Sequence, residues 1–512
     1  MASAARTQGR TVPIARWGAL IAALSMAGCA VGPNFETPVV QGAASAPGYT
    51  PAPQPSQTAS APGTAGASQR FVDAQDLPAQ WWTVFHSEPL DRLIRASLQH
   101  SPTVAAAQAA LRQSQETLDA TTGSLKYPAV GAQFNAERER YTSLSGPGLA
   151  TYNLFTPGVN VSYAMDLFGG NRRTLEGLSA SVDYQRFQVE ATYLTLASNV
   201  VATAIREASL RAQLQATREV LGLQEQQLAV VQSQFSAGAV ARASVLSQST
   251  QVAQTRATLP GLEKSLAQTR HQLSVYAGQL PSEPGVPQFE LDALQLPEEL
   301  PVTLPSALAR QRPDIRASEA LLHAASAQIG VAEANQYPQL NLTATLGVAA
   351  LRTEDLFKTS LIVWSVAAGL TEPIFNGGAL AAKKRAAQAA YEQAQAQYQS
   401  TVLVAFQNVA DVLRAIDSDA TALRTQAEAL ALARESLDLS TRQYQLGAVG
   451  QLALLDAQRQ YQQTRISLVQ AQAARYADTA ALFQALGGGW WNRPASADAA
   501  AAPARLAAAP EH

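Results

Sequence analysis

The stretch VLVAFQNVADVLRAIDSDATALRTQAEALALARESLDLSTRQY, residues 402–444, decides the fold. Hydrophobic residues recur in it at strict seven-residue spacing: Val402, Val409, Ile416, Leu423, Leu430, Leu437 and Tyr444. A heptad pattern sustained over this length predicts coiled-coil packing rather than a helix of a globular domain. Proline is absent from 374 to 493, so the helix can run for about 60 residues, or about 90 Å.

The same pattern occurs 209 residues earlier in the chain. The corresponding positions are Tyr193, Val200, Leu214, Leu221, Leu228 and Phe235, with one interruption at Glu207. Each heptad line ends at a glycine, Gly238 or Gly447, which is expected to stop the long helix before a second helix returns. In the first copy, Pro260 is expected to kink the returning helix. The sequence therefore predicts an internal repeat of long, paired helices.

A candidate β-hairpin precedes the long helix in each copy. A helical pattern ends at Tyr127-Pro128 in the first copy and at Tyr337-Pro338 in the second, and alternating residues follow. In the second copy the apolar set is Leu340, Leu342, Ala344, Leu346 and Val348. Period-two alternation predicts strands with two different faces. An aqueous sheet over a core and a lipid-facing barrel wall would both produce this pattern.

The N-terminal residues have the features of an exported lipoprotein. Residues 1–28 combine arginines with an apolar run that is too short to span a bilayer, which predicts a signal peptide. The run LSMAGC that ends at Cys29 is similar to a bacterial lipobox, and Cys29 is the only cysteine, so no internal disulfide can form. We therefore predict processing before Cys29, a covalent lipid on it, and export to the outer membrane.

These signals divide the chain into six parts. We predict a signal peptide over residues 1–28, a lipid anchor and flexible tether over 29–70, a first repeat over 71–280, a linker over 281–303, a second repeat over 304–493 and a disordered tail over 494–512. The tether is expected to be flexible because residues 41–69 are uncharged and rich in Ala, Pro, Ser, Gly and Gln.

Composition and motifs argue against several other functions. The net charge is −2, from 37 basic and 39 acidic residues, which does not resemble a nucleic-acid-binding protein. The five histidines and the single cysteine lack the spacing of a metal site, and no nucleotide-binding loop or nucleophile elbow is present. We therefore predict no enzymatic activity, no nucleic-acid partner, no metal, and no cofactor other than the lipid on Cys29.

The predicted strands bear on how the chain could cross a membrane. No stretch beyond the N-terminal signal approaches a transmembrane helix, so any spanning part would be a β-barrel. Four strands cannot close a barrel, and eight strands from two chains would leave an interior filled by side chains. Three chains give twelve strands, the smallest assembly of this unit with an open lumen, so transmembrane strands would imply a homotrimer.

These motifs resemble those of the TolC-like outer-membrane factors, in particular the NodT-type lipoprotein subunits of resistance-nodulation-division efflux systems. The residues that carry the resemblance are CAVGPNF at 29–35, WW at 81–82 with Phe85, LPS at 304–306, RPDIRASE at 312–319, PIFNGG at 373–378 and LDAQR at 455–459. The resemblance implies a mixed α and β membrane protein. Its trimer would form a 12-stranded outer-membrane β-barrel continuous with a periplasmic α-helical barrel.

The resemblance also implies a function and partners. The chain would be the exit duct of a tripartite efflux pump, passing small molecules from a resistance-nodulation-division inner-membrane transporter and a periplasmic adaptor to the outside. It would be anchored by lipid in the cell outer membrane, with a long periplasmic part. A TolC-like duct for protein secretion and a non-pore coiled-coil structural lipoprotein are the alternatives.

Two sets of residues would carry this function. The first, at the helix tips where the adaptor would dock, is Gly238, Val245, Leu246, Gly447, Leu454 and Leu455. The second, at the periplasmic constriction that the resemblance places at the LDAQ motif, is Leu452, Asp456 and Tyr444. Stacked apolar and carboxylate rings would impede wetting and favour cations. From the sequence alone, Asp456 could equally form an ordinary surface ion pair with Arg459 at i+3.

The prediction for the anchor can be tested directly. Mass spectrometry of the mature N-terminus should find Cys29 as the first residue, carrying acyl chains. Several chains would hold the protein firmly in the membrane, because each buried methylene contributes about 0.8 kcal/mol. An unmodified thiol at Cys29 in the mature protein would contradict the assignment.

Overall fold

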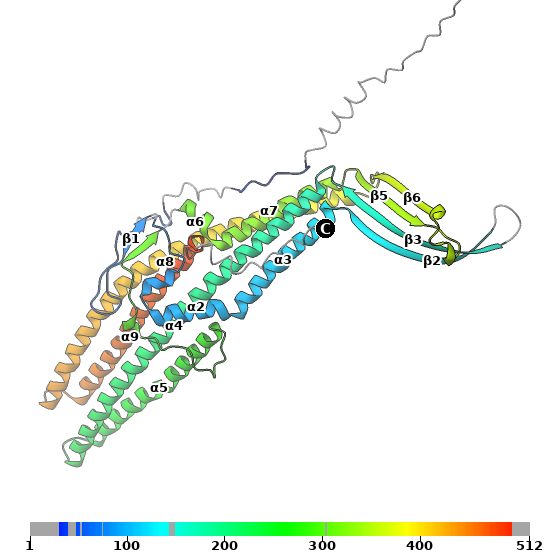
Figure 1. Cartoon of the computed structure of the whole chain (residues 1–512). Coiled ribbons are helices and arrows are strands. Elements are labelled where there is room, and N and C mark those ends of the chain that lie inside the picture. The colour runs from blue at the N-terminus through cyan, green and yellow to red at the C-terminus, as the bar shows by residue number, and fades with distance from the viewer. Residues whose placement is uncertain are drawn as a thin grey trace, which may run out of the picture. The chain divides into compact units, whose positions relative to one another are not determined.

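The computed structural model describes residues 30–38, 48–51, 54–73, 75–142, 149–302 and 305–493. Cys29, the predicted signal peptide and the predicted tail lie outside these residues. The chain divides into two compact units (Figure 1). Within the described residues, unit 1 takes 30–38, 111–185 and 318–398, and unit 2 takes 48–51, 54–110, 186–317 and 399–493.

The internal repeat is confirmed. The first copy contains α3 (Pro102–Lys126), β2 (Ala129–Thr142), β3 (Leu149–Met165), α4 (Gly170–Ser236) and α5 (Arg242–Tyr276). The second copy contains α7 (Pro313–Ala334), β5 (Gln339–Val348), β6 (Ile362–Thr371), α8 (Ala379–Gln445) and α9 (Gln451–Ala485). Both long helices have 67 residues and both returning helices have 35. Helix α5 runs through Pro260 without ending.

Shorter elements complete the described chain. They are β1 (Arg70–Asp73), η2 (Trp81–Phe85), α2 (Glu88–His100), η3 (Leu291–Ala293), β4 (Glu299–Val302), α6 (Pro305–Gln311), η4 (Thr353–Asp355), η5 (Thr359–Leu361) and η6 (Trp490–Asn492). Strands β1 and β4 pair in parallel. Among the described helices, none combines the length and hydropathy that a membrane-crossing helix needs.

Unit 1 contains an antiparallel sheet in the order β2-β3-β5-β6. Strand β3 joins the two hairpins, with Met165 opposite Leu340. The predicted apolar residues share one face, because opposed pairs such as Val130–Val161 and Leu340–Leu370 point to the same side. Large apolar side chains on this face are exposed: Val130, Phe134, Val159, Leu346, Trp364, Val366 and Leu370. The apolar face of this sheet therefore does not cover a core within the described chain, as a sheet of a water-soluble domain would.

The core lies in unit 2, where the long helices pack around the tryptophan motif. Trp81 stacks on Phe483 with ring centroids 5.5 Å apart, and Phe85 packs edge-on against Tyr476. Four heptad residues of the long helices belong to the same core: Val200, Val409, Ile416 and Leu423. Leu214, Leu221 and Val402 are also buried. The early part of the heptad pattern thus marks a buried stripe, whereas Phe235, at the end of the first line, is exposed.

The single interruption of the heptad pattern has a structural reason. Glu207 is fully buried and accepts hydrogen bonds from Arg211, from Arg270 Nη1 at 3.0 Å and from the backbone N–H of Phe289 at 3.0 Å. Phe289 belongs to the predicted linker and is itself buried. A buried carboxylate needs such partners, so Glu207 exchanges a coiled-coil contact for a polar attachment of the linker to α4 and α5.

Residues 54–69, here called the strap, pack on unit 2. The prediction that they form part of a flexible tether is therefore wrong. Arg475 of α9 is completely buried and donates to Ala65 O at 2.8 Å, Ala67 O at 2.7 Å and Thr58 Oγ1 at 2.9 Å. Gln69 Nε2 donates to Thr479 Oγ1 at 3.2 Å. Small uncharged residues suggested disorder, but they also let backbone carbonyls approach a buried cation closely.

Two carboxyl groups lie beside the same arginine. Asp419 of α8 shares a hydrogen bond with Asp478 of α9, next to Arg475. Burial, and after it the hydrogen bond and charge of Asp478, raise the pKa of Asp419 to about 7, against the opposing charge of Arg475. Asp419 Oδ2 and Arg475 Nε are buried without a hydrogen-bond partner, while the terminal nitrogens of Arg475 donate to the strap.

This arrangement predicts a pH dependence of strap packing. The pKa of Asp419 lies above its ordinary value of 3.8, so the packed state holds a proton that an opened state releases. The stabilisation is complete below about pH 4 and is lost as the pH rises through about 7. The opening equilibrium constant of residues 54–69, from hydrogen exchange corrected for intrinsic rates, should rise about tenfold or more between about pH 5 and pH 8.

A matched pair of variants checks the cause. Asp419→Asn should make strap opening nearly independent of pH over this range, because the amide does not titrate. Asp417→Asn, which replaces a nearby carboxylate that pairs with Arg414 at 3.5 Å, should retain the dependence. A full pH dependence in Asp419→Asn would show that another group is responsible.

Candidate functional site

The two helix tips are built in the same way. At the end of α4, Ala239 N–H donates to Gln234 O at 2.8 Å, and Gly238 has φ 75°. At the end of α8, Ala448 N–H donates to Gln443 O at 2.8 Å, and Gly447 has φ 72°. Both are left-handed glycine caps of the Schellman type. No atom lies within 4 Å of a Cβ built on either glycine, so the tips need glycine for the backbone and not for lack of space.

The other predicted tip residues differ in exposure. Leu246 is exposed and Val245 is half-buried, whereas Leu454 and Leu455 are buried. The last two residues therefore pack within the chain and are not available on its surface, which corrects their assignment as docking residues. The sequence could not distinguish these cases, because both repeats place apolar residues just beyond the glycine.

A second apolar stripe along the long helices was missed. It comprises Leu223 and Val230 on α4, Leu432 and Leu439 on α8, and Leu446 just after α8, and all five are exposed. Leu446, directly before Gly447, is 85% exposed. The signal was in the sequence, since these residues also recur every seven positions and the α4 residues lie 209 before Leu432 and Leu439. A coiled-coil helix with two apolar stripes can pack against neighbours on two sides.

The predicted constriction residues fall into two places. Leu452 and Asp456 lie one turn apart at the start of α9, on the same exposed face. Tyr444 belongs to the end of α8 and is half-buried, and its hydroxyl donates to Gln234 Oε1 of α4 at 3.3 Å. The structure thus brings Leu452 and Asp456 together, and it uses Tyr444 to tie one helix tip to the other.

Leu452 and Asp456 lie opposite the packed face of α9. On that packed face, Gln451 Nε2 donates to Ser244 O of α5 at 2.9 Å. Leu452 is 74% exposed, and Asp456 pairs with Arg459. Both partners of this ion pair are largely exposed, so the pair contributes little stability and leaves the carboxylate accessible.

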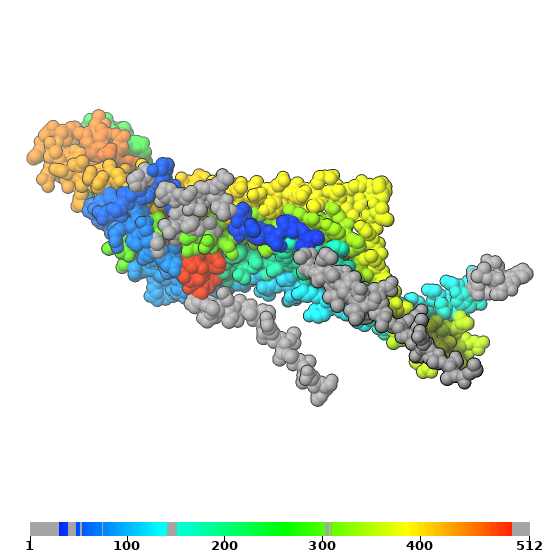
Figure 2. Space-filling view, turned by 90° about the horizontal axis from the view of Figure 1, so that it is seen from above, coloured from blue at the N-terminus to red at the C-terminus, as the bar shows by residue number. Residues whose placement is uncertain are grey.

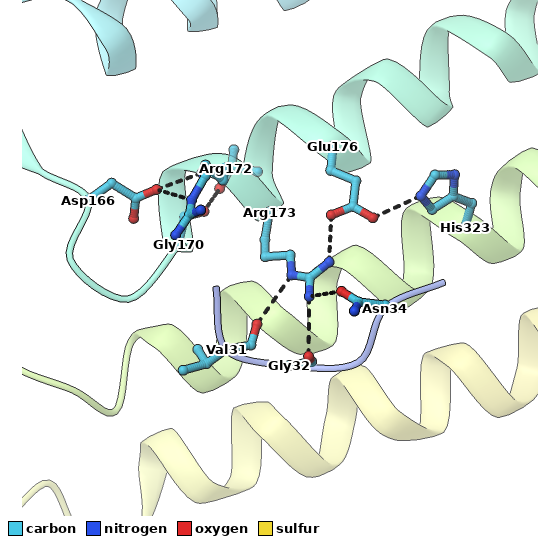
Figure 3. A network of polar contacts seen from close by, with 10 residues as sticks. Val31, Gly32, Asn34, Asp166, Gly170, Arg172, Arg173, Glu176 and His323 are labelled. Carbon is cyan, nitrogen blue, oxygen red and sulfur yellow. Dashed lines mark hydrogen bonds and ion pairs between the residues drawn. The ribbon is translucent and has the colours of Figure 1, made fainter. Parts of the chain in front are cut away.

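A polar network in unit 1, here called the clasp, holds residues 31–35 against α4 and α7 (Figure 3). The guanidinium of Arg173, which is nearly buried, donates to Val31 O at 3.2 Å, Gly32 O at 3.2 Å and Asn34 Oδ1 at 2.9 Å. Val31 N–H in turn donates to Phe168 O at 3.0 Å. This segment, dark blue in Figure 2, lies on the surface of the unit.

The far side of the clasp is held by Glu176. Its carboxylate accepts from Arg173 Nη1 at 2.8 Å and pairs with His323 Nε2 at 2.9 Å, and His323 stacks on Phe35 with ring centroids 4.4 Å apart. Burial alone would raise the pKa of Glu176, but the hydrogen bonds from Arg173 and His323 lower it below its usual value. The clasp therefore fixes the chain two residues after Cys29 at the turn between β3 and α4.

The clasp could not be deduced from the sequence. The Val-Gly-Pro-Asn-Phe run appeared there only as a motif that follows Cys29. Its partners Arg173 and His323 are about 140 and 290 residues away in the chain, and no periodicity links them to it. Within the described residues, no cluster of His, Cys, Asp and Glu could hold a metal ion.

Comparison with known proteins agrees with this architecture. The chain matches the family described as "Outer membrane efflux protein" over residues 93–279 and 304–488. It is 34% identical over 460 residues to the pyoverdine export outer membrane protein OpmQ of Pseudomonas aeruginosa, covering 86% of this chain and 94% of OpmQ. It is 29% identical to the cation efflux system protein CusC of Escherichia coli K12, covering 91% of this chain and 98% of CusC.

A solved structure shows the same similarity in three dimensions. The outer-membrane channel OprN superposes with a TM-score of 0.81 at 26% identity, covering 90% of this chain and all of the OprN chain. The two long helices, the two hairpins and the glycine tips described above therefore belong to a known channel architecture. The chain is a member of the outer membrane efflux protein family, a TolC-like outer-membrane factor that serves as an efflux channel of the cell outer membrane and has no enzymatic activity.

Proposed function

We propose that three copies of this chain close into one duct, which receives small molecules from a resistance-nodulation-division transporter through a periplasmic adaptor and releases them outside the cell. Outer-membrane factors act as trimers within tripartite efflux pumps. The observation that carries the proposal for this chain is its incomplete sheet. Strands β2 and β6 are edges, and apolar side chains along the sheet are exposed.

Closure of the sheet would resolve both features at once. An open strand edge leaves backbone N–H and C=O groups unpaired, which lipid does not tolerate. Pairing β6 of one copy with β2 of the next would satisfy these groups and would produce twelve strands in three copies. The exposed apolar face would then meet lipid, and the face with Asn160, Ser162, Asn341 and Thr343 would line the lumen.

The helices support the same assembly. Each chain contributes four helices, α4, α5, α8 and α9, so three chains would place twelve helices around the duct. The exposed stripe of Leu223, Val230, Leu432, Leu439 and Leu446 is larger than a lone surface residue, and such stripes mark contact surfaces. Neighbouring copies would cover part of it, and the adaptor would cover the tip near Leu446.

The anchor and the cargo complete the proposal. The clasp holds Val31 beside the β3–α4 turn, so acyl chains on Cys29 would enter the membrane next to the base of the sheet. Cargo would be small molecules rather than proteins, because the similar proteins are named for the export of pyoverdine and of cations. The transporter would select the cargo.

The docking role of the tips predicts a loss of export. Gly447→Trp should abolish export in cells that carry the matching adaptor and transporter, measured as drug susceptibility and dye retention, while trimers remain in the outer membrane. The left-handed φ adds only about 1–2 kcal/mol of strain, and a Cβ built on Gly447 has no neighbour within 4 Å, so the chain should still fold.

Two controls separate docking from folding. Gly447→Asn, which tolerates a left-handed backbone better, should retain much more export than Gly447→Trp. Gly261→Trp adds the same bulk at an open, exposed glycine of α5 and should leave export intact. Normal export by Gly447→Trp and by the matching Gly238→Trp variant would refute the docking role.

The constriction role of Leu452 and Asp456 predicts altered conductance. In planar bilayers, the double variant Leu452→Ala/Asp456→Ala should conduct severalfold more than the wild type, because an apolar ring is removed. It should also discriminate less between cations and anions, because a carboxylate ring is removed.

A variant with the opposite expectation provides the control. Arg459→Ala removes the cation that pairs with Asp456 and should increase cation preference. If the double variant leaves conductance and selectivity unchanged, the constriction lies elsewhere and Asp456 is only an exposed ion-pair partner.

A further inference from the structure

The first and second copies meet in unit 1 at an aromatic junction. Phe168, in the turn after β3, stacks on Tyr337, at the end of α7, with ring centroids 4.7 Å apart and an interplanar angle of 17°. Next to this stack, a Cβ built on Gly170 would lie 3.1 Å from Cβ of Ala334, so α4 begins in close contact with α7. The junction extends the pairing of β3 with β5 into the first turn of α4 and the last turn of α7.

The repeat supplies the same residues a second time, at the two edges of the sheet. Tyr127-Pro128, just before β2, repeats Tyr337-Pro338, and Ile374-Phe375, just after β6, repeats Leu167-Phe168. Strands β2 and β6 are the outermost strands of the sheet. Each edge therefore carries one half of a junction whose complete form exists between β3 and β5.

These half-junctions are bare. Tyr127 is 65% exposed, against 38% for Tyr337, and Phe375 is 91% exposed, whereas Phe168 is half-buried. Ile374, beside Phe375, is 97% exposed. Isolated exposed aromatic residues are ordinary on a protein surface, but here each bare residue has a less exposed counterpart in the other repeat.

Space and charge at the two edges are also complementary. A Cβ built on Gly378, the second glycine after Phe375, would have no neighbour within 4 Å, whereas Gly170 is in close contact with α7. Lys126 adjoins Tyr127, and Glu372 lies three residues before Phe375. Both are exposed, and within the described residues neither takes part in an ion pair. Opposite charges thus stand beside the two bare rings.

We infer that neighbouring chains of the trimer complete this junction, with Phe375 of one chain stacked on Tyr127 of the next. The inference rests on the proposed trimer and names the contact that closes it. The contact is head-to-tail, so three copies use three identical stacks and the ring closes. Val130 on β2 and Leu370 on β6 belong to the same apolar face, so pairing these edges would keep that face continuous around the ring.

Cysteine cross-linking of the full chain in outer membranes tests the contact. A calibrating double variant, Phe168→Cys/Tyr337→Cys, first identifies the shortest bifunctional thiol reagent that joins the two positions within one chain, followed by mass spectrometry as the loss of both thiols. The double variant Tyr127→Cys/Phe375→Cys is then treated with that reagent. With strands about 4.8 Å apart, the two edges of one sheet are too distant for a reagent of that span.

The expected result is a covalent trimer for Tyr127→Cys/Phe375→Cys and no covalent oligomer for either single variant. Co-expression of the two single variants should give covalent dimers and no covalent trimer, because each chain then carries only one of the two introduced cysteines and can be joined to only one neighbour. This pattern would identify a head-to-tail contact through these two residues.

Two other outcomes overturn the inference in distinguishable ways. If native mass measurements find trimers and the calibrating pair reacts, but Tyr127→Cys/Phe375→Cys forms no covalent oligomer, the stack is wrong and the trimer stands. If the wild-type chain itself is not a trimer, the proposed function fails together with the stack. The variant Tyr127→Phe, which keeps the ring, should form trimers as resistant to heat in detergent as those of the wild type, whereas Tyr127→Ala should form less resistant trimers.

Discussion

The unpaired hydrogen-bonding groups along β2 and β6 are the constraint on which the rest of the structure depends. A sheet of four strands with an exposed apolar face is not a stable end state in water or in lipid. Each hairpin nevertheless continues directly into a 67-residue helix, so whatever completes the sheet also sets the spacing of the helices. The exposed stripes on α4 and α8 and the bare rings of Tyr127 and Phe375 are consistent with the same demand for neighbours.

Buried polar residues give the helices a second task, which is to hold the extended segments of the chain. Arg475 binds carbonyls of the strap, Glu207 binds the backbone N–H of Phe289 in the linker, and Arg173 binds carbonyls of the clasp segment. In each case one charged side chain on a long or returning helix satisfies the backbone of a segment that lacks its own ladder. Because an unpaired buried charge is costly, each segment and its helix are expected to stabilise one another.

The sequence predicted the helices and hairpins well because periodicity is a local signal. Seven-residue spacing marked the buried positions from Val402 to Leu423, and alternation marked the apolar face of β5. It failed where order depends on distant residues. The strap was mistaken for a flexible tether because its partner Arg475 lies 410 residues from Ala65. Leu454 and Leu455 were assigned to the docking surface because their place just after the tip glycine does not state which neighbour covers them.

In a trimer of chains that each contain two repeats, residues that both repeats share differ in number from residues that only one repeat has. Residues shared by both copies, such as Gly238 and Gly447, would occur six times around the duct and shape every tip alike. Residues found in one copy only would occur three times. Asp456 has Ser247 as its counterpart 209 residues earlier, and Leu452 has Ala243. These two differences lie one turn apart on an exposed face and distinguish the start of α9 from the start of α5. A ring of three identical side chains, such as the proposed constriction, can form only at positions where the two repeats differ. The glycine caps, which both repeats share, would occur six times.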